Sequence, residues 1–280
     1  MRKDYFALNK HFIERSIAHR GLHSETVSEN SLQAFRLAIE GGYAIEIDIH
    51  LLKDGELAVV HDSNLSRVTG QEAVVEELTS MQLANYPLTK NGEKIPTLKE
   101  TLALVDGQAP LLIELKFENG FDKRQADALL DQLANYPYKD MVALRSFHPA
   151  AVKFLKKKTK EYSVGFLTSY KLGKGKLVTY LLKSLALHGW MRADFVSYDI
   201  TYLPNKYVLK KRKQGYQVLT WTVRTFEAAE KAKTVADNII FEGIRVKPWK
   251  KTKFYTGRTL RKVIPVILSK NCKKSTPWSR

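Results

Sequence analysis

Cysteine is almost absent from this sequence of 280 residues, in which Cys272 is the single example. One thiol cannot form a disulfide within the chain, and it cannot supply the cluster of thiolates that a structural zinc site needs. We therefore expect the chemistry of this protein to come from carboxylates, histidines and basic side chains.

Long apolar runs are missing as well. No stretch reaches the roughly 18 apolar residues that mark a membrane-spanning helix. The amino terminus (MRKDYFALNKHFIERS) carries charges where a signal peptide is apolar. The composition, 44% hydrophobic and 27% charged, is that of an ordinary globular protein with enough chain for a sizeable core. These features predict a cytoplasmic protein.

Acidic residues are missing from the end of the chain. Residues 245–280 contain 12 Lys or Arg and no Asp or Glu, so this segment carries 12 of the 17 net positive charges. The charge distribution therefore predicts two parts, a catalytic body at residues 1–248 and a basic C-terminal tail at residues 249–280.

The basic tail mixes its cations with aliphatic residues. This pattern predicts peripheral contact with an anionic membrane surface. Because Pro265 interrupts a helix there, a packed terminal strand or a disordered basic arm is the alternative interpretation. Binding of nucleic acid is not expected, because the interleaved aromatic residues of single-strand binding platforms are not evident.

Apolar runs of strand length alternate along the chain with stretches of helical period. Strands are expected at residues 15–21, 44–51, 110–116, 141–147, 162–169, 193–200, 217–223 and 237–241, with a hairpin partner at 57–62. Helices are expected at residues 29–42, 122–136, 149–158, 176–189, 205–215 and 225–233. The loop-rich stretch at 68–97 is expected to form a small insertion without clear structure of its own.

This order of elements predicts an α/β protein with the architecture of a (β/α)8 TIM barrel. The run Leu111–Ile113 is continuously apolar, as expected for a parallel strand that is buried on both faces. A doubly wound open sheet is the alternative, because the number of strands does not reveal closure. No glycine-rich dinucleotide or P-loop fingerprint follows any of the strands, which argues against the open sheet.

Polar side chains interrupt two of the predicted strands. Glu46, Asp48 and His50 alternate with isoleucines and therefore share one face of a strand. Two carboxylates about 7 Å apart on a buried face repel each other unless a cation lies between them. A solvent-facing edge strand is the alternative, but Glu114 and Lys116 repeat the pattern in a second strand. Three carboxylates predict a site for a hard cation, Mg2+ or Ca2+.

Two histidines end strands beside these carboxylates, His19 in IAHRG and His61 in AVVHD. A single histidine at a strand end is more often structural than catalytic. A pair can act as general base and general acid, because imidazole titrates near neutral pH. Arg20 and Lys116 add fixed positive charge, so the whole set suits a phosphate-containing substrate.

The motifs HRG, SENSLQAF, EIDIHLLKDGELAVVHD, LSRVTG and IELK, in this order, resemble the glycerophosphodiester phosphodiesterase family. The resemblance is clearest over residues 16–116 and continues through SFHP at 146–149 and TWTV at 220–223. It implies hydrolysis of glycerophosphodiesters to glycerol 3-phosphate and an alcohol, dependent on one divalent cation. It also implies that Trp221 lines the substrate pocket, although packing inside the barrel explains the same residue. The active-site positions that it implies are His19, Arg20, Glu46, Asp48, His61, Glu114 and Lys116.

The last strand departs from the family pattern. The family usually ends this strand in a Gly-Ile-x-Thr-Asp-x-Pro-like turn, whereas this chain reads NIIFEGIRVKPW. We therefore expect Phe241 and Glu242 to reshape one wall of the pocket. A lysophospholipase D-like phosphodiesterase is an alternative function. A catalytically silent barrel that binds anionic membranes is another, but such a barrel has no chemical need for three carboxylates, two histidines and a lysine.

Overall fold

The computed structural model describes residues 5–118, 120–170 and 175–246, and the predicted basic tail at 249–280 lies outside them. Eight parallel strands form a ring in which β1 pairs with both β9 and β2. This closure confirms the predicted (β/α)8 barrel and rules out the open sheet. The strands are β1 (Ile17–Ala18), β2 (Ala44–Leu51), β4 (Leu111–Leu115), β5 (Val142–Ser146), β6 (Ser163–Thr168), β7 (Phe195–Asp199), β8 (Gln217–Val223) and β9 (Asn238–Phe241), with β3 (Leu57–Val59) antiparallel to β2.

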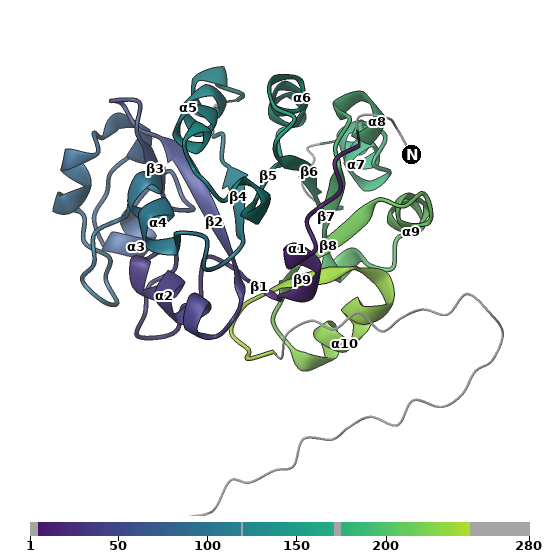
Figure 1. Cartoon of the computed structure of the whole chain (residues 1–280), viewed down its shortest axis with the longest axis horizontal. Helices are drawn as coiled ribbons and strands as arrows, with labels where there is room; N and C mark the ends of the chain where they lie inside the picture. The colour runs from purple at the N-terminus through teal and green to yellow at the C-terminus, as the bar shows by residue number, and fades with distance from the viewer. Residues whose placement is uncertain (1–4, 119, 171–174, 247–280) are drawn as a thin grey trace, which may run out of the picture.

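Helices follow the strands and surround the barrel (Figure 1). The α-helices are α1 (His11–Glu14), α2 (Leu32–Glu40), α3 (Ser66–Thr69), α4 (Leu98–Val105), α5 (Lys123–Ala134), α6 (Pro149–Lys158), α7 (Lys176–Lys183), α8 (His188–Met191), α9 (Lys206–Lys213) and α10 (Phe226–Val235). Short 3-10 helices are η1 (Val75–Glu77), η2 (Met81–Asn85), η3 (Lys139–Met141) and η4 (Ile200–Tyr202). The helix expected at 176–189 is in fact divided into α7 and α8.

The two faces of β2 have different surroundings, as its alternating sequence predicts. Ile45, Ile47 and Ile49 are fully buried in the large core between the strands and the surrounding helices. The other face of β2 points into the barrel, because successive side chains of a strand lie on opposite faces. Ala44 lies at the start of this inner face, and the carboxylates come after it. The same alternation in the neighbouring strands brings polar groups together at the carboxyl ends of the strands.

A second core fills the barrel at the amino ends of the strands. Residues that begin strands, among them Ile17, Ala44 and Phe195, pack there against Leu8 and Phe12 of the amino-terminal segment. The side-chain amide of Asn238 ties this segment to β9 by donating to the Phe12 and Arg15 carbonyl oxygens at 2.7 and 2.6 Å. The amino-terminal segment therefore closes one end of the barrel and leaves the other end for the site.

The stretch between β3 and β4 is more ordered than the sequence suggests. Residues 63–97, here called the insertion, contain α3, η1 and η2 around a small hydrophobic core. The expectation of no clear structure was therefore wrong, because short helices lack the long periodicity that marks a helix in sequence. Helix α4 was also missed. Its signal is local, since Thr97 and Glu100 form a reciprocal capping box at its amino terminus.

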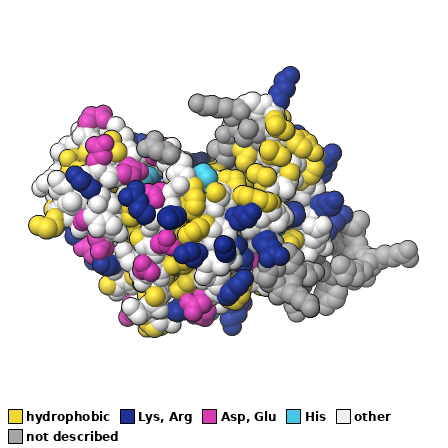
Figure 2. Space-filling model, turned by 90° about the horizontal axis from the view of Figure 1, so that it is seen from above, with side chains coloured by type: hydrophobic (Ala, Val, Ile, Leu, Met, Phe, Trp, Pro, Cys, Tyr) yellow, Lys and Arg dark blue, Asp and Glu magenta, His cyan; other side chains and the backbone are white. Residues whose placement is uncertain are grey.

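The surface differs between the two halves of the face seen in Figure 2. Most of the visible acidic side chains lie in the left half, and hydrophobic side chains gather in the right half. Histidine side chains reach the surface near the middle of this face. Among the helices of the described residues, none is both long and apolar enough to cross a membrane.

Candidate active site

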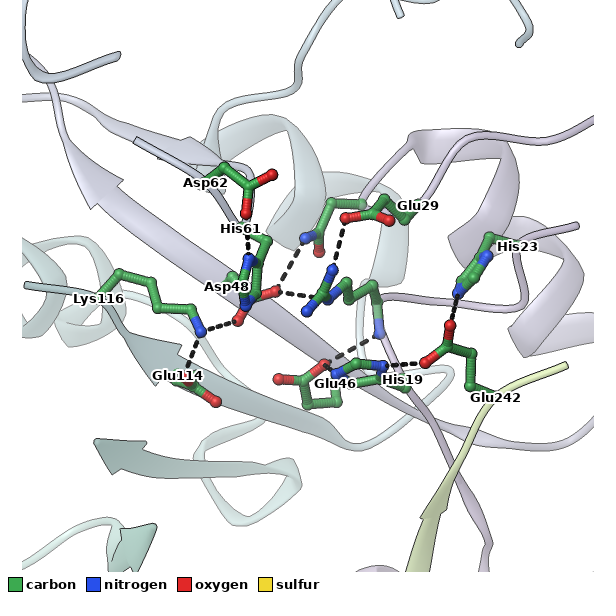
Figure 3. Close-up of polar contacts among 12 residues, drawn as sticks. His19, His23, Glu29, Glu46, Asp48, His61, Asp62, Glu114, Lys116 and Glu242 are labelled. Carbon is green, nitrogen blue, oxygen red and sulfur yellow. Dashed lines mark hydrogen bonds and ion pairs between the residues drawn. The ribbon is translucent and has the colours of Figure 1, made fainter. Parts of the chain in front are cut away.

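Three carboxylates converge at the carboxyl ends of β2 and β4. One oxygen atom from each of Glu46, Asp48 and Glu114 can be chosen so that all three lie within 4.8 Å of one another, and all three residues are buried. Asp48 and Glu114 are register partners on these adjacent strands, which explains their proximity. The predicted alternation of polar and apolar residues therefore brings these three residues to one point inside the barrel (Figure 3).

Cations compensate these buried charges. Lys116 Nζ lies 3.1 Å from Asp48 Oδ1 and 2.5 Å from Glu114 Oε1. Arg20 Nε lies 3.3 Å from Asp48 Oδ2. Arg145, which the sequence analysis did not identify, contacts Glu46 at 2.7 Å and Glu114 at 3.0 Å from Nη2. Its position inside the apolar run VALRS was the available signal, since an unpaired arginine is rarely buried.

These neighbouring charges shift the pKa values of the carboxylates in different directions. Burial and the neighbouring Asp48 charge raise the pKa of Glu46. Burial also acts to raise the pKa of Asp48, but the charges of Lys116 and Arg20 outweigh it and lower that pKa. Burial acts to lower the pKa of Lys116, yet Asp48 and Glu114 raise it. Asp48 and Lys116 thus hold each other in their charged forms, whereas burial and the Asp48 charge raise the pKa of Glu46 and so favour its protonated form.

The oxygen atoms of the three carboxylates suit a hard divalent cation. Asp48 Oδ1 and Glu114 Oε1 are buried and accept no hydrogen bond from the described residues, although both contact the Lys116 ammonium. Carboxylate oxygens are the ligands that Mg2+ and Ca2+ prefer, so this convergence of buried carboxylates fits such a cation. Another polar group supports the cluster, because Asn30 Nδ2 donates to Asp48 Oδ2 at 3.0 Å. The sequence analysis missed Asn30 as well.

His19 lies beside the cluster and is held by Glu242. His19 Nδ1 and Glu242 Oε2 are 2.9 Å apart, and His19 Nε2 is 4.0 Å from Glu46 Oε2. The hydrogen bond from His19 is the main cause that lowers the pKa of Glu242 to about 2. Glu242 thus contacts a predicted catalytic residue directly. The expectation that Phe241 shapes the pocket was wrong, because Phe241 packs in the outer core against Tyr43 with ring centroids 4.9 Å apart.

Arg20 has an uncommon backbone conformation for a residue with a side chain, with φ of 54°. Its N–H donates to Glu46 Oε2 at 2.9 Å, and its guanidinium donates to Glu29 Oε1 at 2.7 Å. These bonds fix the strained turn after β1, and the guanidinium borders the cavity described below.

His61 is held on two sides by residues of the insertion and its neighbours. His61 Nδ1 lies 2.5 Å from Asp62 Oδ1, and Asp62 in turn accepts a hydrogen bond from Arg67. Arg67 also donates to both carboxylate oxygens of Glu29 at 2.9 and 2.7 Å. The main chain is held separately, because His50 Nε2 lies 3.0 Å from the His61 carbonyl oxygen. The third polar residue of β2 therefore supports a site residue and does not face the cation cluster.

A cavity of about 230 Å3 lies above the carboxylate cluster. Both histidines border it, and Trp221 borders it with its ring packed edge-on against Phe147. The structure therefore brings the eight predicted site residues to one end of the barrel, six of them bordering the cavity and Glu46 and Asp48 lying in the cluster beneath. The residues that line the cavity are His19, Arg20, His61, Glu114, Lys116, Arg145, Phe147, Leu167, Asp199, Thr201, Trp221, Thr222 and Arg224.

Known proteins are similar to this chain in sequence and in fold. The chain is 28% identical over 234 residues to a glycerophosphodiester phosphodiesterase from Caldanaerobacter subterraneus subsp. tengcongensis, covering 80% of this chain and 92% of the relative. It is 31% identical over 134 residues to a lysophospholipase D from Mus musculus, covering 43% of this chain and 42% of the relative. A phosphodiesterase from Oleispira antarctica, solved in complex with the product sn-glycerol-3-phosphate, shares the fold with a TM-score of 0.71 at 23% identity, covering 82% of this chain and 93% of that one.

A match over more than half of the chain shows the family to which it belongs. A sequence profile of the "Glycerophosphoryl diester phosphodiesterase family" matches residues 19–243, which begin at His19 after β1 and extend just past Glu242. The match therefore includes the whole set of site residues and more than half of the 280 residues. This chain belongs to the glycerophosphoryl diester phosphodiesterase family, and it is an enzyme of the phosphodiesterase class.

Proposed function

We propose that the chain hydrolyses glycerophosphodiesters to glycerol 3-phosphate and an alcohol. The observation that carries the proposal is the convergence of three buried carboxylates within 4.8 Å beneath a cavity that two histidines border. The names of the relatives support the same reaction, as does the product bound to the Oleispira antarctica enzyme.

The two histidines supply general acid and base catalysis in this proposal. Each ring is hydrogen-bonded at Nδ1 to a carboxylate, His19 to Glu242 and His61 to Asp62, which leaves Nε2 for proton transfer. One histidine takes a proton from the attacking water, and the other gives a proton to the alcohol oxygen as its bond to phosphorus breaks. Arg20 and Lys116 offset the negative charge of the bound phosphate.

The carboxylates hold the cofactor. Glu46, Asp48 and Glu114 would bind one divalent cation, Mg2+ or Ca2+, which when bound would act as a Lewis acid toward the phosphate oxygens. These residues also keep Lys116 and Arg145 in place, so the basic groups stay aimed at the same point.

The test is turnover of glycerophosphocholine by the purified full chain, followed as release of glycerol 3-phosphate. We expect activity that a chelator abolishes and that added Mg2+ or Ca2+ restores. Turnover that persists in chelator would refute the cation requirement. His61→Ala should lower kcat by about a hundredfold or more, since general acid–base groups contribute about that much. If this variant keeps near-normal turnover, the assignment of His61 is wrong.

A lysophospholipase D-like activity is the second candidate. The partial match to the mouse enzyme favours it. So does a hollow of about 290 Å3 beside the cavity, whose lining includes Phe117, Phe147 and Pro149 and could accept an acyl chain. Comparing lysophosphatidylcholine with glycerophosphocholine separates the two functions when release of choline, the product common to both, is followed. A lysophospholipase D cleaves lysophosphatidylcholine faster, to lysophosphatidic acid and choline. Membership of an enzyme family argues against the catalytically silent barrel.

The basic tail is proposed to bind anionic membranes, and residues 1–248 are proposed to fold without it. Each cation near an anionic leaflet contributes about 1 kcal/mol, so 12 cations without acids in residues 245–280 can support reversible binding. Deletion of residues 249–280 should abolish sedimentation with anionic vesicles and leave hydrolysis of glycerophosphocholine intact. Failure of the full chain to sediment at low salt would refute the membrane proposal. The cytoplasmic location stays a prediction.

A further inference from the structure

The cavity has a second wall, opposite the carboxylate cluster. In the ring of eight strands, β7 lies across from β2 and β8 lies across from β4. Asp199 ends β7, and Trp221 is its register partner on β8. Phe147, which follows β5, packs edge-on against Trp221 with ring centroids 5.5 Å apart. Asp199 and Trp221 therefore border the cavity on the side away from the cation site. Phe147 borders it between Trp221 and Lys116, whose Nζ lies 5.9 Å from the centroid of the Phe147 ring.

The carboxylate of this wall has no cationic partner among the described residues. Asp199 accepts hydrogen bonds from the Ser169 hydroxyl at 2.9 Å and from the Thr201 N–H at 2.8 Å, both neutral donors. The cations that border the cavity are instead paired with other carboxylates: Arg20 with Glu29 and Asp48, Lys116 with Asp48 and Glu114, Arg145 with Glu46 and Glu114, and Arg224 with Glu242. Within residues 5–118, 120–170 and 175–246, therefore, no cation pairs with the carboxylate that Asp199 presents to the cavity.

We propose that Asp199, Trp221 and Phe147 form a subsite for a positively charged head group on the leaving alcohol, such as a quaternary or primary ammonium group. This inference rests on the proposed hydrolysis of glycerophosphodiesters. Ammonium groups bind to the faces of aromatic rings through cation–π attraction, and a neighbouring carboxylate adds Coulomb attraction. With the phosphate at the basic and carboxylate-rich wall and the ammonium at this one, such a substrate has charge complementary to both walls of the cavity.

Two substrates of equal shape test the proposal. One is glycerophosphocholine, and the other is its carbon isostere, in which a tert-butyl group replaces the trimethylammonium group. We expect the full-length enzyme to favour the charged substrate by about tenfold in kcat/KM, as cation–π and charge contacts of this kind imply. Asp199→Asn keeps one acceptor oxygen for the Thr201 N–H and places an amide NH2, which can donate to the Ser169 hydroxyl, where the second oxygen was. It removes the charge, so it should lower this ratio by a similar factor.

Two further variants complete the experiment. Asp122→Asn removes a carboxylate from the exposed start of α5 and should leave the substrate ratio unchanged, because Asp122 does not border the cavity. Phe147→Leu removes one ring and should lower the ratio through the aromatic part of the subsite. An equal loss of activity on both substrates in Asp199→Asn would overturn the proposal, because Asp199 would then act as a hydroxyl acceptor or as a structural residue.

Binding of choline itself gives a reading that does not depend on turnover. Calorimetric titration of the full chain should show weaker binding of choline to Asp199→Asn than to the unmodified protein. Equal binding of choline to both proteins, or no binding to either, would overturn the proposed subsite even if hydrolysis proceeds. Conversely, a protein that binds choline through Asp199 and releases no glycerol 3-phosphate would refute the proposed reaction and leave the subsite standing.

Discussion

Glu114 connects the proposed cation site to the basic residues around it. One of its oxygens contacts Lys116 and the other contacts Arg145, so its charge compensates two buried cations, and on the proposed roles its carboxylate would also be a ligand. Loss of this charge should therefore affect binding of the cation and the positions of the basic side chains together.

Glu114→Gln is the corresponding prediction, because it preserves the shape of the side chain. We expect weaker Mg2+ or Ca2+ binding and a loss of kcat/KM of about a hundredfold, the scale of losses on removal of an electrostatic contact to the reacting group. Isothermal titration with the metal and steady-state kinetics measure the two effects. Glu118→Gln, in an exposed residue just beyond the same strand, is the matched control. Metal affinity that is unchanged in Glu114→Gln would contradict the assignment.

Glu29 makes stability depend on pH. Burial acts to raise its pKa, but the hydrogen bonds and charges of Arg67 and Arg20 prevail and lower the pKa from the ordinary 4.5 to about 2. A carboxyl whose pKa is depressed on folding stabilises the protein above the unfolded value. That contribution is lost as pH falls from about 4.5 toward about 2.

Glu29→Gln should therefore lower the free energy of unfolding at neutral pH by an amount on the order of 3 kcal/mol. The difference between the two proteins should shrink when denaturant unfolding is repeated at about pH 3 and lower. A difference that stays constant from pH 7 to pH 3 would show that the Arg67 and Arg20 contacts do not act through the charge of Glu29.

The insertion acts on the site at the scale of an element. It carries Arg67, which joins Asp62 to Glu29 and so fixes the carboxylate that holds His61. It also carries Glu76, whose carboxylate lies 2.6 Å from His50 Nδ1, while the other nitrogen of that ring faces the His61 main chain. The insertion therefore positions His61 from two directions without bordering the cavity.

Arg67→Ala should lower kcat by about tenfold and change KM less, because Arg67 holds the carboxylate that contacts His61, the proposed proton-transfer residue, and does not border the cavity. Arg36→Ala is the control, since Arg36 is equally exposed on α2 and pairs only loosely, at 3.7 Å, with Glu93. Steady-state kinetics of both variants, with circular dichroism to verify folding, decide the matter. Equal kcat values for the two variants would count against positioning by the insertion.

Sequence patterns predicted the barrel strands and most of the longer helices, and they missed α4 and the helices of a single turn. The eight barrel strands and the polar residues within them were predictable, because a period of two is visible even in a segment such as residues 44–51. Helix α3 and the 3-10 helices were not, since one turn carries no periodicity. Arg145, Asn30 and Asp199 were missed for another reason. Arg145 and Asn30 pair with carboxylates of β2 and β4, and Asp199 borders a cavity whose other walls come from other strands. No local pattern states which strands become neighbours.

The stability of the whole barrel depends on its closure at the amino ends of the strands. Phe12 has no exposed surface and packs where several strands begin, although it precedes the barrel in sequence. Phe12→Ala should lower the free energy of unfolding by about 3–5 kcal/mol, the usual loss for a buried phenylalanine. Phe226→Ala, in a residue that is 62% exposed, is the control and should change stability little. A loss below about 1 kcal/mol for Phe12→Ala would show that the amino-terminal segment is dispensable.

Closure of the ring has a consequence for synthesis on the ribosome. β1 pairs with β9, and His19 is held by Glu242, a residue 223 positions later in the chain. A growing polypeptide contains all three carboxylates once β4 has been made, but it contains the partner of His19 only when translation has passed residue 242. A chain that stops between these two points therefore includes the proposed cation ligands and lacks the residue that holds His19. On the proposed roles, unfinished chains cannot cleave phosphodiesters, and activity begins only when the barrel is complete.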